Sequence, residues 1–104
     1  MTDRELLEMA AKAAGVKYIA TAEDGARFLV DMTRWNPLTD DEDALRLAVK
    51  FSIFVDINHT YVQAEIFDGK KKTACQSVSV DGDPCAATRR AIVCAVAEIG
   101  RNMP

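Results

Sequence analysis

Apolar residues recur at helical spacing in the first segment of the chain. Thr2 is a suitable N-cap, and Glu5, three residues later, completes a capping box. Leu6 and Ala10 then share one face, and Gly15 stands where glycine commonly ends a helix. The pattern predicts a helix between Thr2 and Gly15 whose apolar face serves packing.

Residues 17–31 have the pattern of a short hairpin. The runs "KYIAT" (17–21) and "RFLVD" (27–31) favour β-structure, and Glu23-Asp24-Gly25 between them is turn chemistry. We predict two paired strands here.

The stretch "WNPLTDDEDALRLAVK", residues 35–50, places four consecutive acids before an amphipathic run. Thr39 or Asp40 can cap a helix, and acids in its first turn lie near the positive end of the helix dipole. The expected buried stripe comprises Leu45, Ala48 and Val49, with Ala44 beside them. Four consecutive acids cannot all face one metal ion, so we interpret them as a helix start. Trp35 is expected to pack against the core or its rim.

Alternation follows in "FSIFVDI" (51–57), "YVQAEIF" (61–67) and "TACQSVSV" (73–80), with Gln76 interrupting the apolar face of the last run and an Asp68-Gly69 hairpin signal before it. One face of each strand is expected to be buried. Phe54 and Phe67 on the second face indicate that it is partly covered too. Asp83 and Pro84 then suit the start of a final helix, which Gly100 is expected to end.

These elements predict one α+β domain over residues 1–104, because a chain of this length has enough apolar residues for only one core. We expect an antiparallel sheet of four to five strands packed with three helices, with helices on both faces as an α-β-α sandwich. The composition is ordinary for a globular protein, with 49% apolar and 28% charged residues.

The chemistry-bearing residues are few. Cys75, Cys85 and Cys94 have no CxxC spacing, and His59 is the only histidine. We therefore expect no catalytic, cofactor-binding or metal-binding residues, no cofactor and no enzyme activity. The absence of a signal peptide or an apolar span predicts a cytoplasmic protein.

Two blocks resemble a known family. "WNPLTDDEDALRLAVK" and "AATRRAIVCAVAEIG" (86–100), together with "RELLEMAAKAAG" (4–15), resemble small phage and prophage proteins of the phage ABA sandwich domain family. The family commonly has glycine where this chain has Glu42, and the departure favours helix over loop. The resemblance implies helices on both faces of a sheet and a bacterial host cell. The family has no known activity, so it assigns no site residue.

The basic residues suggest an alternative function. Lys70, Lys71 and Lys72 crowd a hairpin tip, and Arg89 and Arg90 lie in the second turn of the last helix. A helix, three strands and a helix also occur in this order in double-stranded RNA-binding domains, where basic residues contact phosphates. The net charge of −3 disfavours nucleic acid as a partner.

The leading hypothesis is a small phage or prophage accessory protein that acts by contact with a host or phage protein. A nucleic-acid backbone binder that uses the five basic residues is the alternative. Self-association into a homodimer, through a sheet edge or the surface around Phe54 and Phe67, is also open.

Overall fold

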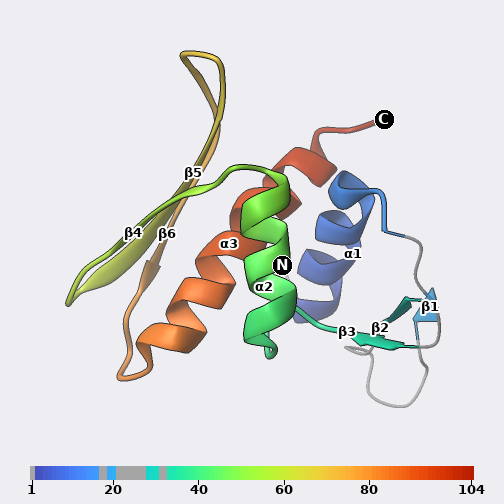
Figure 1. The fold of residues 1–104 in the computed structure, drawn as a ribbon, viewed down its shortest axis with the longest axis horizontal. Coiled ribbons are helices and arrows are strands. Elements are labelled where there is room, and N and C mark those ends of the chain that lie inside the picture. The colour runs from blue at the N-terminus through green and yellow to red at the C-terminus, as the bar shows by residue number, and fades with distance from the viewer. Residues whose placement is uncertain (1, 17–18, 21–27, 31–32) are drawn as a thin grey trace.

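The computed structural model describes residues 2–16, 19–20, 28–30 and 33–104. Its helices are α1 (Asp3–Ala14), α2 (Asp41–Lys50) and α3 (Pro84–Arg101). Its strands are β1 (Ile19–Ala20), β2 (Phe28–Val30), β3 (Thr33–Trp35), β4 (Phe54–Ile57), β5 (Tyr61–Asp68) and β6 (Lys71–Ser79). Figure 1 shows the helices to one side of the β4–β6 sheet, with α3 nearest to it.

The strands form two antiparallel sheets of three, ordered β1-β2-β3 and β4-β5-β6. The α+β class is therefore confirmed, whereas the single sheet of four to five strands is not. The predicted strand pair in residues 17–31 is present as β1 and β2, and its turn at 23–25 lies outside the described residues. The sequence pattern missed β3, which pairs with β2.

The β4–β6 sheet has one covered and one open face. Along β5, Val62, Ala64 and Ile66 are buried, whereas Tyr61 and Phe67 at its ends are exposed. The described helices lie on the covered side (Figure 1). The expected cover on the second face is not seen among the described residues, where Phe54 is 63% exposed and Phe67 45%.

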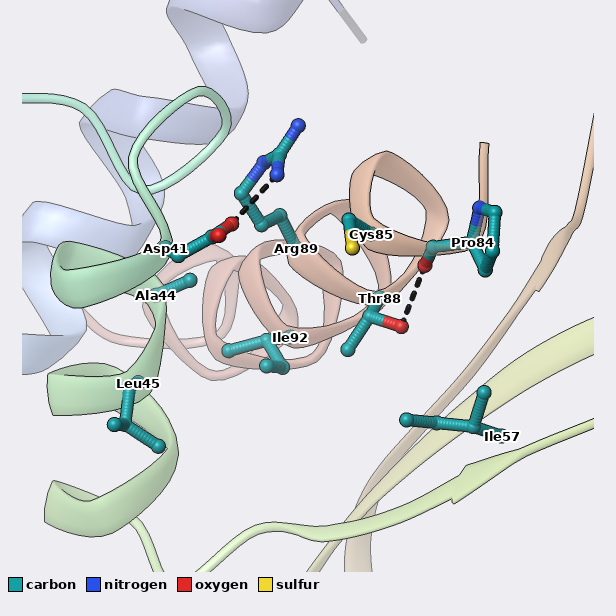
Figure 2. A pocket seen from close by; sticks show the side chains of 9 residues that line it. All are labelled: Asp41, Ala44, Leu45, Ile57, Pro84, Cys85, Thr88, Arg89 and Ile92. Carbon is teal, nitrogen blue, oxygen red and sulfur yellow. Dashed lines mark hydrogen bonds and ion pairs between the residues drawn. The ribbon is translucent and has the colours of Figure 1, made fainter. Parts of the chain in front are cut away.

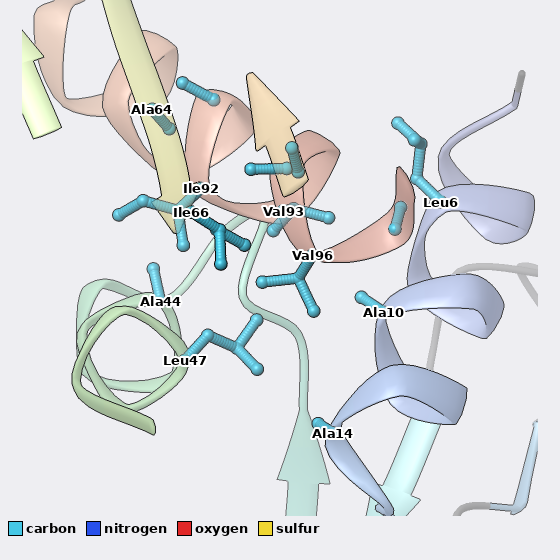
Figure 3. Close-up of a cluster of buried hydrophobic side chains, with 14 of the residues drawn as sticks. Leu6, Ala10, Ala14, Ala44, Leu47, Ala64, Ile66, Ile92, Val93 and Val96 are labelled. Carbon is cyan, nitrogen blue, oxygen red and sulfur yellow. The ribbon is translucent and has the colours of Figure 1, made fainter. Parts of the chain in front are cut away.

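Helix α3 lies at the centre of the fold. It contacts α1, α2 and all three strands of the second sheet. Consecutive residues are accordingly buried in its middle, as in Ala91-Ile92-Val93 and Ala95-Val96-Ala97, whereas Cys94 between them is partly buried. Residues 91–97 are apolar on all sides, which suits the part of a helix that lies in an interior. Val93 and Val96 meet Leu47 of α2 and Ile66 of β5 in the core (Figure 3).

Gly100 does not end α3, contrary to the sequence prediction. The helix continues through Arg101, and Asn102 is its C-cap. A Cβ atom on Gly100 would lie 2.7 Å from the carbonyl carbon of Met9 in α1 and closer still to the carbonyl oxygen. Glycine is therefore needed here because the two helix backbones almost touch.

The helix starts agree with the sequence prediction. Thr2 and Glu5 form the capping box, with the Glu5 N–H 3.1 Å from the Thr2 hydroxyl. Gly15 ends α1 in the left-handed conformation, at φ 69°. Of the two candidates for α2, Asp40 is the cap, since its carboxylate accepts from the Asp43 N–H at 3.2 Å. Asp83 caps α3 ahead of Pro84.

The predicted buried stripe of α2 is wrong at Leu45 and Val49, whereas Ala44 is buried and Ala48 partly buried as predicted. Ala44 and Leu47 are buried, whereas Leu45 is 62% exposed and Val49 71%. Helix α2 makes its main contacts with α3 alone, so only one narrow face is covered. The two exposed side chains lie one turn apart, on the same side of the helix.

Candidate functional site

An open groove of about 390 Å³ lies between α2, β4 and the start of α3. Figure 2 shows its lining residues: Asp41, Ala44 and Leu45 from α2, Ile57 from β4, and Pro84, Cys85, Thr88, Arg89 and Ile92 from α3. Helix α3 is far from α2 and β4 in the sequence and meets them only through the tertiary fold.

The exposed aliphatic side chains of the groove have a structural origin. Ile57 pairs with the buried Val62, so it points to the helix-facing side of the sheet. It remains 58% exposed because β4 is an edge strand of its sheet. Leu45 faces it from α2, and the buried Ile92 lies between them (Figure 2). Val49, one turn beyond Leu45, extends this apolar surface along α2.

The polar side chains of the groove make bonds within the chain. The Arg89 Nε donates to the Leu38 carbonyl at 2.9 Å, and its Nη1 lies 2.6 Å from Asp41 Oδ1. The Thr88 hydroxyl donates to the Pro84 carbonyl at 2.7 Å. Arg89 thereby joins the start of α2 to α3, and only 18% of its side chain is exposed. The groove thus presents mainly apolar atoms.

We expect Arg89→Ala to lower the free energy of unfolding by about 1–2 kcal/mol, because the partly buried Leu38 carbonyl loses a charged donor. The ion pair with Asp41 adds little, since that carboxylate is largely exposed. The adjacent Arg90 is the matched control: its pair with Asp3 is more exposed on the arginine side, and Arg90→Ala should cost less than about 1 kcal/mol. Urea unfolding followed by Trp35 fluorescence measures both. Equal losses of stability in the two variants would contradict a role for Arg89 in joining the start of α2 to α3.

Each of the four consecutive acids has its own partner. Asp40 caps α2, Asp41 pairs with Arg89, and Glu42 pairs with Arg46. Asp43 accepts from the Asn36 N–H at 2.9 Å; partial burial raises its pKa, and this hydrogen bond opposes the rise. These contacts support the interpretation of the acids as a helix start. Trp35 packs against the core from a partly buried position, as expected.

The five candidate basic residues fall into two separate groups. Lys70, Lys71 and Lys72 occupy the β5–β6 hairpin, whereas Arg89 and Arg90 lie near the start of α3, beyond the opposite end of β6. The nine residues of β6 span about 30 Å, so the structure does not bring the groups together. Lys72 pairs with Glu65 at 3.0 Å, which raises the lysine pKa, and lies 5.9 Å from the Phe67 ring centre. Nucleic-acid binding stays a prediction.

The cysteines and the histidine occupy different parts of the fold. Cys75 is exposed on the open face of the sheet, beside Gln63, and Cys85 is exposed in the groove. Cys94 is partly buried in α3, and burial raises its pKa, which favours the unreactive thiol. His59 lies in the β4–β5 turn. Among the described residues, no group of three or more histidines, cysteines and carboxylates could hold a metal ion.

Comparisons of the chain with family models, with curated proteins and with solved structures found no match. Within the described part of the chain, no helix is long and apolar enough to cross a membrane.

Proposed function

We propose that this chain is a small accessory protein of phage or prophage type, working in the bacterial cytoplasm by binding another protein and not by catalysis. The observation that carries the proposal is the pair Leu45 and Ile57, two large aliphatic side chains that line one groove and are each more than half exposed. Val49, also exposed, follows Leu45 one turn along α2. Contiguous apolar surface of this kind on a small domain is typical of interaction sites.

The lining of the groove favours a protein over a small polar ligand. Small-molecule sites combine apolar walls with a few polar groups aimed at the ligand. Here Arg89 and Thr88 already bond to the chain itself, so the groove offers mainly burial of apolar surface. Apolar side chains on a protein partner supply that burial.

The open face of the β4–β6 sheet is a weaker candidate for this contact. Its exposed aromatic residues are Phe54, Tyr61 and Phe67, but polar side chains lie among them. Lys72 bridges Glu65 and the Phe67 ring, and Gln63 bonds to Glu65. A continuous apolar surface is therefore found at the groove and not on this face.

The proposal is tested by affinity capture from a bacterial host extract with three forms of the protein. Leu45→Asp places a charge in the groove, and Phe54→Asp places the same charge on the open sheet face. Both residues are more than 60% exposed, so both variants should fold with nearly unchanged stability.

We expect a partner that the native chain and Phe54→Asp retain and that Leu45→Asp loses. Retention by Leu45→Asp with loss by Phe54→Asp would assign the contact to the sheet face. Size-exclusion chromatography of the three forms shows whether that contact is a homodimer.

A further inference from the structure

Acidic residues outnumber basic residues in the two segments that contribute α2 and α3 residues to the groove. The two segments that frame it, residues 40–46 and 81–89, contain six acids and two arginines: Asp40, Asp41, Glu42, Asp43, Asp81 and Asp83 against Arg46 and Arg89. Their formal charge of −4 exceeds the −3 of the whole chain, so the remaining residues together carry +1. The amino-terminal ends of α2 and α3 offset only about half a charge each.

Much of this charge is accessible. The Asp41 side chain is 77% exposed and that of Glu42 67%, although each has an arginine partner. Asp40 directly precedes α2, and Asp81 and Asp83 precede α3. All three residues are exposed. A partner that enters the groove therefore meets carboxylates on two sides, and complementary positive charge would speed and orient its binding.

The shape of the apolar surface favours a helical occupant. Leu45 on α2 and Ile57 on β4 lie on opposite sides of the groove with Ile92 of α3 between them, and the exposed Val49 follows Leu45 one turn along α2. An amphipathic helix binds such a groove through anchors at i, i+3, i+4 and i+7. Addition of a strand to the free edge of β4 is less suitable, because β4 has only four residues.

We propose that the groove between α2, β4 and α3 binds an amphipathic helix whose apolar face is flanked by lysines or arginines. This inference rests on the proposed function and specifies the chemistry of the partner. Apolar anchors fill the space between Leu45 and Ile57, and the basic side chains reach the carboxylates at the starts of α2 and α3.

Two thiols of the chain provide the readout. Cys85 lines the groove, whereas Cys75 lies on the open sheet face, and both are exposed. The probe is a leucine–lysine peptide of about 18 residues, long enough to form a helix, with leucines on one face. Alkylation of each cysteine by iodoacetamide is followed by mass spectrometry.

With the peptide at about ten times its Kd, alkylation of Cys85 should slow about tenfold, because only the unoccupied fraction reacts. The rate at Cys75 should not change. Leu45→Ser should abolish the protection, and Phe54→Ser should preserve it. An analogue with glutamate in place of lysine should bind at least about tenfold more weakly at low salt, with a smaller difference at high salt.

The other outcomes separate this inference from the proposed function. Equal protection by both peptides would overturn the basic partner and leave groove binding intact. If neither peptide protects Cys85 but Leu45→Asp still loses the host partner, the amphipathic helix is excluded as the occupant and the proposed function stands. Protection of Cys75 in place of Cys85 would place the peptide on the sheet face. Protection of Cys85 by raised protein concentration without peptide would identify a second copy as the occupant.

Discussion

Gly100→Ala is expected to lower the free energy of unfolding by about 2–3 kcal/mol and the Tm by about 10–20 °C. The added Cβ would overlap the carbonyl group of Met9, which belongs to the backbone of α1 and has no alternative rotamer. The helices must therefore move apart, and the packing between them is lost. Alanine favours a helix by about 1 kcal/mol relative to glycine. The expected loss of about 2–3 kcal/mol is the net value after this gain has been subtracted from the cost of the clash.

Gly15→Ala is the matched control for this substitution. Gly15 has φ 69°, and a Cβ there would meet nothing within 4 Å. Its replacement should cost about 1 kcal/mol of backbone strain without any clash. Thermal unfolding by circular dichroism compares the two variants. A Gly100→Ala variant as stable as the native chain would show that α1 and α3 are not in such close contact.

Leu47→Ala is expected to cost about 3 kcal/mol, because Leu47 is only 3% exposed and lies in the core cluster. Leu45→Ala, two residues earlier on the same helix, should change stability by less than about 0.5 kcal/mol, since Leu45 is 62% exposed. Urea unfolding of both variants, followed by Trp35 fluorescence, measures the difference. A larger loss of stability for Leu45→Ala than for Leu47→Ala would show that Leu45 is buried, as the sequence pattern predicted.

Local chemistry made the element boundaries predictable. The Thr2–Glu5 capping box, Gly15 at the end of α1 and Asp83-Pro84 at the start of α3 are signals that act within a few residues. The alternation of "YVQAEIF" likewise predicted which side of β5 is buried, because a strand has only two faces.

The face of a short helix was harder to predict. Apolar residues stand at positions 44, 45, 47, 48 and 49 of α2, and they cover more than one side of it. Which side is buried depends on where α3 lies, and the spacing does not contain that information. The groove depends on the same arrangement, since Leu45 and Ile57 gain their role only once α2 and β4 flank α3. Gly100 has a local reason to end a helix, and its packing against Met9 overrides that reason.

The central position of α3 also has a consequence for how the chain folds during synthesis. Helices α1 and α2 make their main contacts with α3, and so does the covered face of the second sheet. Until residues 84–101 have left the ribosome, these apolar surfaces have no core to join, and they remain open to chaperones or to aggregation. Docking of this one helix then buries several surfaces at once, so the α1, α2 and β4–β6 elements should become stable together and not one by one.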